Sequence, residues 1–318
     1  MKRNYGRCVL AMSILVAVAA GLPALADTRI EKTLKLGPGG LFVLDSEGGS
    51  VTITGSSRSD VSVVITSERD DLESLVAFTF EGGSETARVT MERIKKTNWG
   101  RGLSLAYEIE VPRDTRLDLR TSGGSVTARG TRGEAKLRTS GGSIRVNDLD
   151  GPVNAGTSGG SITIDSIGGD AKISTSGGNI RGAHVDGAVT AGTSGGSISL
   201  SDVKGDLSAE TSGGSISIAE AGGVVDAQTS GGSVTVEFAQ GNQRGGSLKT
   251  SGGGIRVTLD GAANLDLDAH CSGGSVKTDL PVTVVGDLSK NTLKGALGAG
   301  GSTLKMRTSG GSIRIESM

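Results

Sequence analysis

Serine and threonine side chains recur at a fixed spacing along this chain, and their hydroxyl groups are well suited to hydrogen-bond a ligand. Seven copies of one phrase follow one another every 18 residues. Each reads Thr-Ser-Gly-Gly, then Ser or Asn, then Ile or Val, and the copies begin at Thr121, Thr139, Thr157, Thr175, Thr193, Thr211 and Thr229. A strict period of this length indicates one structural unit stacked on itself.

The first candidate site is the set of hydroxyl residues that alternate with buried aliphatic residues in the repeat. It comprises Ser161, Thr163, Ser197, Ser199, Ser215 and Ser217. A flat array of such groups could bind a glycan or an ordered surface. The simpler interpretation, which we favour, is a solvated face whose residues suit a β-strand. Arg145 and Arg181 interrupt the array, which argues against an ice-binding surface.

The second candidate site is a basic cluster before the repeats. Trp99 and Arg101 stand beside Arg93, Lys95 and Lys96. Such a cluster could contact an acidic envelope polymer or lipid headgroups. More often a run of this kind is a solvated loop, so both interpretations stay open.

Residues for catalysis or metal binding do not form a recognisable set. His184 and His270 are the only histidines, and neither has a Cys, His or Asp partner at metal-site spacing. Cys271 occupies the threonine position of an irregular phrase, where it is expected to act as a small buried residue. We therefore predict no catalytic, cofactor-binding or metal-binding residue, no cofactor, and no enzyme activity.

The elements that position these residues are read from one repeat. In residues 157–174, Ile162 and Ile164 alternate with polar residues, and Ala171 and Ile173 do the same further on. Each alternation predicts a short strand with one apolar face. The predicted fold is therefore all-β, a single-stranded parallel β-solenoid with 18-residue coils and two short strands in each coil. The inward threonines should hydrogen-bond backbone at the turns.

Two other repeat folds are excluded by the pattern. A hexapeptide helix needs an aliphatic residue at every sixth position, but Gly168 and Ser174 follow Ile162 at that step. A calcium-binding roll needs a recurring Asp in Gly-rich turns, and no carboxylate recurs at one turn position here. Residues 165–169 are expected to form an ordinary turn with one apolar plug.

Three segments are predicted along the chain. Residues 1–26 have a basic start, an apolar stretch and a small-x-small pattern before Asp27, which is typical of a cleaved signal peptide. Residues 27–118 hold most of the aromatic side chains and are expected to form a β-rich cap, with one helical turn at residues 70–75. Residues 119–318 form the repeat region, regular over 121–246 and irregular over 247–318, where residues 312–318 are expected to close the last edge.

Charge and hydropathy limit the partners. Removing residues 1–26 leaves 30 basic and 34 acidic residues, a net charge of −4, which argues against nucleic acid. No second apolar stretch is long enough to span a bilayer, so we expect no transmembrane segment after signal cleavage. The expected location is the periplasm or the cell surface and extracellular space.

Several short motifs resemble one known family. Pro38–Gly40, Glu47–Gly55, Tyr107–Pro112 and Leu119–Val126 follow one another as PGG, EGGSVTITG, YEIEVP and LRTSGGSV, which is similar to the DUF4097 family of adhesins. The resemblance covers residues 30–318 and implies an exported or envelope-facing β-solenoid. It carries over no catalytic residue.

The leading functional hypothesis is an exported, non-enzymatic, adhesin-like or scaffolding protein of the cell envelope. Its expected partner is a glycan, a cell-envelope polymer or another envelope protein. An envelope-stress sensor or regulatory partner that binds through the aromatic cap is the main alternative. A carbohydrate-active β-helix enzyme is a weaker one, because it needs acidic residues clustered on one face of adjacent coils.

Overall fold

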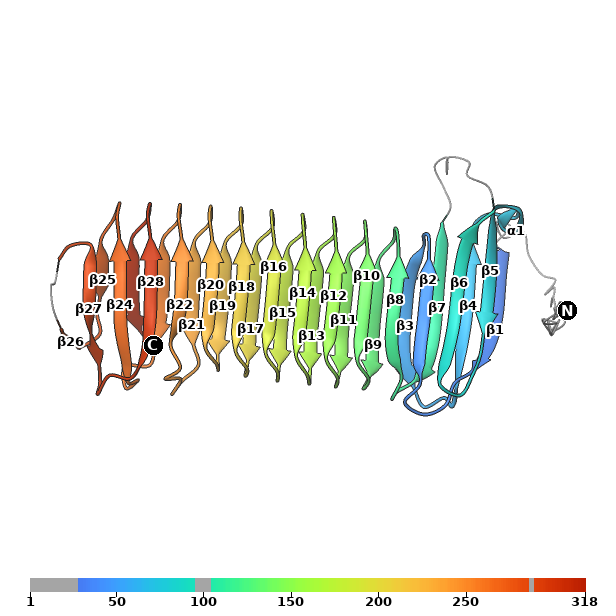
Figure 1. Ribbon diagram of the computed structural model, residues 1–318, viewed down its shortest axis with the longest axis horizontal. Coiled ribbons are helices and arrows are strands. Elements are labelled where there is room, and N and C mark those ends of the chain that lie inside the picture. The colour runs from blue at the N-terminus through green and yellow to red at the C-terminus, as the bar shows by residue number, and fades with distance from the viewer. Residues whose placement is uncertain (1–27, 95–103, 286–288) are drawn as a thin grey trace, which may run out of the picture.

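The protein is a rod built from two long β-sheets that face each other (Figure 1). The computed structural model describes residues 28–94, 104–285 and 289–318. Within those residues one sheet has 14 strands, which we call sheet A, and the other has 15, which we call sheet B. The predicted all-β fold with a solenoid-like repeat is confirmed.

The regular part of the rod has two strands for each repeat, one in each sheet. Sheet A contains β9 (Val126–Thr131), β11 (Ile144–Leu149), β13 (Ile162–Ile167), β15 (Ile180–Val185), β17 (Ile198–Val203), β19 (Ile216–Ala221) and β21 (Val234–Phe238). Sheet B contains β8 (Arg116–Thr121), β10 (Ala135–Thr139), β12 (Val153–Thr157), β14 (Ala171–Thr175), β16 (Val189–Thr193), β18 (Leu207–Thr211) and β20 (Val225–Thr229).

Parallel pairing keeps equivalent residues of successive repeats opposite one another. In sheet A, Ile144 of β11 lies opposite Ile162 of β13, and in sheet B, Ala135 of β10 lies opposite Val153 of β12. Both offsets equal the 18-residue period of the sequence. Each position therefore forms a row along the rod, with a rise of about 4.8 Å between neighbouring strands.

The core is a thin aliphatic layer between the two sheets. In the regular repeats, the first inward residue of five successive sheet A strands is at most 1% exposed, namely Ile144, Ile162, Ile180, Ile198 and Ile216. One repeat alone could not bury these side chains, because each sheet face is covered by the strands of its own and neighbouring repeats. The alternation read from the sequence therefore assigns the buried face correctly.

The threonine that opens each phrase joins one repeat to the previous one. Thr157 Oγ1 donates a hydrogen bond of 2.8 Å to the carbonyl oxygen of Gly142 and accepts one of 3.3 Å from the Gly160 N–H. The donated bond recurs at 2.7–2.9 Å from Thr139, Thr175, Thr193, Thr211 and Thr229. The predicted structural role of this column is confirmed, and these threonines are buried.

The turn predicted at residues 165–169 begins later in the structure. Asp165 and Ser166 belong to β13, and Ser166 has a left-handed backbone with φ of 58°. The same conformation recurs every 18 residues at Asp148, His184, Asp202 and Glu220. Asn, Asp and His tolerate this conformation better than most residues, so a bend inside the strand replaces the expected turn there.

The N-terminal segment continues both sheets of the repeat region. Its elements are β1 (Thr28–Lys35), β2 (Leu41–Ser46), β3 (Ser50–Ser56), β4 (Asp60–Ser67), α1 (Leu72–Leu75), β5 (Val76–Glu81), β6 (Thr86–Arg93) and β7 (Leu105–Pro112). β2 lies between β6 and β8, and β3 lies between β7 and β9. The segment is β-rich and has the expected helical turn, while the division at residue 118 stays a prediction.

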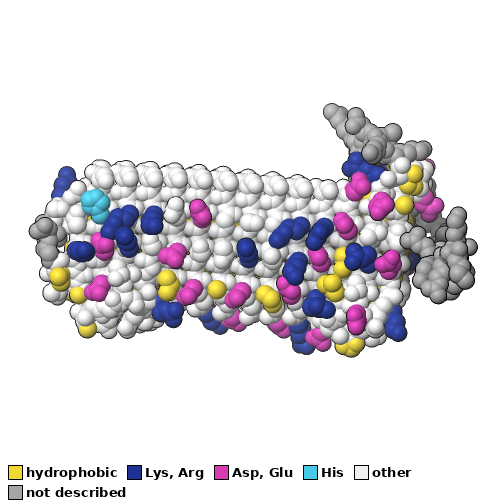
Figure 2. Space-filling view, in the orientation of Figure 1, with side chains coloured by type: hydrophobic (Ala, Val, Ile, Leu, Met, Phe, Trp, Pro, Cys, Tyr) yellow, Lys and Arg dark blue, Asp and Glu magenta, His cyan; other side chains and the backbone are white. Residues whose placement is uncertain are grey.

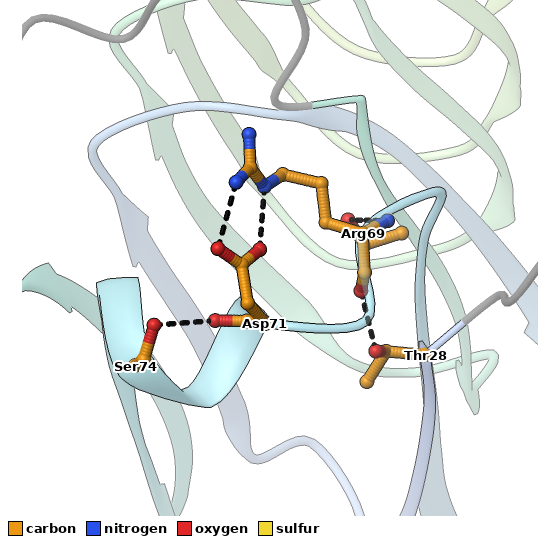
Figure 3. Close-up of polar contacts among 5 residues, drawn as sticks. Thr28, Arg69, Asp71 and Ser74 are labelled. Atoms are coloured by element: carbon orange, nitrogen blue, oxygen red, sulfur yellow. Dashed lines mark hydrogen bonds and ion pairs between the residues drawn. The ribbon is translucent and has the colours of Figure 1, made fainter.

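Antiparallel strands end the rod at this side. β1 pairs with β4, β4 with β7, and β5 with β6, all antiparallel. Figure 3 shows how the start of β1 is fastened: Thr28 Oγ1 donates a 2.5 Å hydrogen bond to the carbonyl oxygen of Arg69. The Arg69 guanidinium makes two 2.7 Å hydrogen bonds to the Asp71 carboxylate, and Ser74 Oγ donates to the Asp71 carbonyl oxygen.

The larger side chains of the core gather in this N-terminal segment. Phe42 and Tyr107 are at most 1% exposed, and Phe78 meets the Tyr107 ring edge-on at 6.5 Å between centroids. The Tyr107 hydroxyl lies 2.7 Å from Ser46 Oγ. Burial raises the pKa of Tyr107 well above its ordinary value.

The C-terminal strands do not stack in the order of the sequence. They are β22 (Gly246–Thr250), β23 (Ile255–Leu259), β24 (Leu265–Cys271), β25 (Val276–Thr278), β26 (Val282–Val284), β27 (Thr292–Leu297), β28 (Ser302–Thr308) and β29 (Ile313–Ser317). β28 lies between β22 and β24, and β29 lies between β23 and β25 (Figure 1). The chain's last strand pair is thus inserted beside the regular repeats.

This insertion corrects the expectation for residues 312–318. Ile313 and Ile315 are fully buried, as expected. However, β29 has hydrogen-bonded neighbours on both sides, so it is not the last edge of sheet A. β25 and β26 hold the edges of the two sheets at this end.

No helix in the described part of the chain is long and apolar enough to cross a membrane. The predicted signal peptide at residues 1–26 lies outside the described residues.

Candidate functional site

The exposed face of sheet A contains six of the eight residues singled out in the sequence. It is positioned by short parallel strands whose side chains alternate between core and solvent. Along each strand, the outward residues fall into rows that run the length of the rod. We call the row just before each strand the serine row and the row formed by the second residue of each strand the middle row.

The serine row takes part in backbone hydrogen bonding between repeats. Ser161 Oγ accepts a 3.1 Å hydrogen bond from the Asn179 N–H. Ser197 Oγ and Ser215 Oγ accept 3.2 Å bonds from the next residues of the row, Ser215 and Ser233. These three hydroxyls therefore support the stacking of repeats as acceptors.

The middle row brings Thr163, Ser199 and Ser217 together with basic residues. Eight successive strand pairings align one row, which reads Arg145, Thr163, Arg181, Ser199, Ser217, Thr235, Arg256, Arg314 and Lys277. All of these side chains are exposed except Thr163, which is half-buried. The row can donate hydrogen bonds and supply positive charge to a molecule laid along the rod.

A third row borders the middle row on its other side and carries the nearest carboxylates. Its acidic members are Asp165, Glu237 and Glu316. Glu316 lies 3.5 Å from Arg256 and 3.5 Å from Arg314 in two ion pairs. Neither pair is buried, so each contributes little to stability.

Sequence reasoning missed three members of the middle row. Arg256, Lys277 and Arg314 stand six residues after Thr250, Cys271 and Thr308, as Arg145 stands six residues after Thr139. Aligning the irregular phrases with the regular ones could have found them. Their order along the rod could not be found that way, because it depends on the inserted C-terminal strands.

The second candidate cluster cannot be assigned a place. Trp99 and Arg101 lie outside the described residues, together with Lys95 and Lys96. Arg93 closes β6 and forms a 2.9 Å ion pair with Glu47. The prediction for this cluster therefore stays a prediction.

The exposed face of sheet B differs in its charge pattern. Figure 2 looks onto this side and shows basic and acidic side chains mixed along the rod. Near the C-terminal end, a shallow depression of about 320 Å³ is lined by Lys249, His270 and Arg307 with several hydroxyl residues. Arg307 there pairs with Asp268 at 2.5 Å, and His270 Nδ1 lies 3.0 Å from Thr292 Oγ1.

The two histidines have different partners and neither is bonded to a serine in the described structure. His184 Nδ1 lies 2.7 Å from Asp165 Oδ1 on the exposed edge of the rod. This hydrogen bond and the Asp165 charge raise the pKa of His184, and the charges of Asp202 and Glu220 add to the effect. Among the described residues, no group of three or more His, Cys, Asp or Glu side chains is placed to hold a metal ion.

Comparisons with known proteins find a matching family model. A family model described as Toastrack DUF4097 matches residues 42–316. No curated protein matches the chain.

Solved structures with a similar course of the chain are distant. A "putative adhesin" from Bacteroides fragilis is 12% identical, with a TM-score of 0.41 and coverage of 92% of this chain and 98% of that one. A "putative lipid binding protein" from Parabacteroides distasonis is 13% identical, with a TM-score of 0.41 and coverage of 90% and 96%. Likenesses of this degree carry no information about function.

Proposed function

Because the chain belongs to the Toastrack DUF4097 family, we propose that it is an exported, non-enzymatic, adhesin-like scaffold of the cell envelope. It binds its partner through the exposed face of sheet A. The partner is a glycan or another envelope polymer, or an envelope protein with a matching periodic surface.

One observation carries this proposal: the middle row of sheet A repeats hydrogen-bonding groups in register over nine strands. Thr163, Ser199 and Ser217 present hydroxyls at intervals that are multiples of about 4.8 Å. A partner with its own repeat can make many weak, equivalent contacts at once. Linking such contacts raises the overall affinity well above that of any one of them.

The scaffold in this proposal is a β-solenoid of 18-residue coils with two short strands each. The β-rich segment of residues 27–118 ends it on one side. Its rigidity supports the binding role, because a backbone that is already ordered loses no further freedom when a ligand binds.

A pair of matched variants tests the assigned face. Ser199→Tyr with Ser217→Tyr fills adjacent positions of the middle row. Ser174→Tyr with Ser208→Tyr places two tyrosines on the exposed face of sheet B, two strands apart and in neighbouring rows. Tyrosine suits an exposed strand position, so both variants should fold. Pull-down on the cell-wall fraction and on immobilised polysaccharides should fall only for the sheet A variant. Equal retention by both variants would show that this face is not the binding surface.

Export is tested separately. Fractionation of cells that express the full chain should recover the protein, lacking residues 1–26, from the periplasm, the cell surface or the medium. Recovery of the uncleaved chain from the cytoplasm would refute the proposed location.

A further inference from the structure

We propose that the middle row of sheet A binds a linear acidic polysaccharide through its five cationic side chains. These are Arg145, Arg181, Arg256, Arg314 and Lys277. The inference rests on the adhesin-like function proposed above and adds the charge and shape of the ligand.

The alignment of these five side chains is a product of the fold. They come from β11, β15, β23, β29 and β25, which are far apart in sequence but share one row of sheet A. Eight intervals of about 4.8 Å separate the first member from the last, so the row is about 38 Å long. A straight row on a flat sheet fits an extended polymer better than a compact ligand.

Between Arg145 and Lys277 the charge along this row has one sign; the first carboxylate of the row, Glu108, lies three strands beyond Arg145. From Arg145 to Lys277 the row contains no carboxylate, and the neighbouring serine row contains no charged residue. In the described structure Arg145, Arg181 and Lys277 form no ion pair. Arg256 and Arg314 share the single carboxylate of Glu316. The row therefore keeps most of its positive charge free for a ligand.

Three of the cations stand on successive strands at the C-terminal end of the row. Arg314 lies between Arg256 and Lys277, opposite each of them. Like charges placed opposite one another on neighbouring strands destabilise a sheet. A polyanion bound across these strands would remove that repulsion, so the arrangement favours the bound state.

The spacing favours a polysaccharide over nucleic acid. Arg145 and Arg181 are separated by two strand intervals, about 10 Å, whereas duplex DNA carries one charge for about every 1.7 Å of its axis. The hydroxyls of Thr163, Ser199 and Ser217 fill positions between the cations and can hydrogen-bond sugar hydroxyls. The row has no aromatic residue on which a base could stack.

The test uses sodium polygalacturonate as the acidic polysaccharide, dextran as the neutral one and duplex DNA as a second polyanion. The protein is the mature chain, residues 27–318, and binding is measured by biolayer interferometry at low and at physiological salt. The test variant is Arg256→Ser with Arg314→Ser and Lys277→Ser, which inserts a residue type already present in the row. The control variant is Lys172→Ser with Lys249→Ser and Lys305→Ser on sheet B. Both variants lower the net charge by the same amount.

We expect polygalacturonate to bind the wild-type chain and the control variant with similar affinity. The test variant lacks three exposed ion pairs with the carboxylates of the polymer, so its binding should be about tenfold weaker. Added salt should weaken binding of every variant. Circular dichroism and melting temperature check that both variants remain folded.

The following outcomes overturn the inference. No binding of polygalacturonate at low salt, or equal weakening by both variants, removes the acidic-polymer site from this row. Dextran binding that the test variant leaves unchanged would keep the proposed adhesin-like function and refute only the charge class. Binding of duplex DNA as tightly as polygalacturonate would show a general attraction to polyanions instead of a polysaccharide site.

Discussion

Replacing Gly160 with alanine should destabilise the rod, whereas the same change at the adjacent Gly159 should be almost neutral. A Cβ on Gly160 would lie 2.0 Å from the carbonyl oxygen of Gly142 in the preceding repeat. A Cβ on Gly159 would meet nothing closer than the Gly141 carbonyl oxygen at 3.6 Å, which is an ordinary contact. Of these two glycines, only Gly160 is required by a close approach to the preceding repeat.

The size of the effect follows from what must move. Relieving the contact at Gly160 requires a shift of more than about 1 Å between two backbones joined by the bond from Thr157 Oγ1 to the Gly142 carbonyl, 2.8 Å long. Over-packing costs about 1–3 kcal/mol, and a broken hydrogen bond that leaves its partner unsatisfied adds about 1 kcal/mol or more. We therefore expect a loss of about 2–4 kcal/mol for Gly160→Ala and less than about 0.5 kcal/mol for Gly159→Ala.

Thermal and urea unfolding of both variants, followed by far-ultraviolet circular dichroism, would measure this difference. For a chain of this size, the loss at Gly160 corresponds to a fall in Tm of roughly 3–7 °C. Gly178→Ala provides a second test, because its Cβ would lie 2.0 Å from the Gly160 carbonyl oxygen. Equal melting temperatures for Gly159→Ala and Gly160→Ala would refute the stacking geometry on which the whole rod depends.

Three further predictions concern single side chains. Thr175→Val removes the hydroxyl that donates a 2.8 Å hydrogen bond to the Gly160 carbonyl oxygen. The free energy of unfolding, measured in urea, should fall by about 1–2 kcal/mol. An unchanged free energy of unfolding would mean that water replaces this bond. Asp165→Asn should return the pKa of His184 towards its ordinary value of 6.5, as measured by NMR titration. Because the pKa of His184 is raised in the folded state, wild type should be more stable than this variant below about pH 6.5, and this advantage should vanish as pH rises through the folded-state pKa. A difference in the free energy of unfolding that is the same at all pH values would contradict this prediction. Cys271 is fully buried, so it should resist a thiol reagent in the native protein and react only after denaturation, and rapid native labelling would contradict its placement.

Much of the regular rod follows from local patterns. The alternation around Ile162 and Ile164 sets which side of a strand faces the core, and both residues are at most 1% exposed. Cys271 was assigned to a threonine position from its phrase alone, and it lies opposite Thr308 in sheet B. These assignments succeed because a side chain's direction on a strand depends only on its position in the alternation.

The bend inside each sheet A strand was not predicted. Asp148, Ser166 and His184 occupy it with left-handed backbones, yet they share no single residue type. A residue of any of these types is also common in turns, so the sequence favoured a turn at residues 165–169. Only the pairing on both sides of the bend, with Asp165 and Ile167 each opposite a residue of β15, shows that the strand continues.

The candidate site was recognised in part. Thr163, Ser199 and Ser217 were placed on an exposed face by alternation, and they do lie in one row. Arg145 and Arg181 were treated as interruptions of a hydroxyl array, although the fold makes them members of a longer basic row. Charge density on a surface depends on all neighbouring strands, so no single repeat displays it.

The sequence by itself determined the period, the buried face and the inward threonines, because each of these is a property of one repeat. The tertiary structure alone decided that the pair β28 and β29 is inserted before β24 and β25. That order places Arg256, Arg314 and Lys277 side by side. The physical reason is that main-chain hydrogen bonds between strands are the same whatever the side chains. Several stacking orders therefore satisfy the local pattern, and only the packing of the complete rod selects one of them.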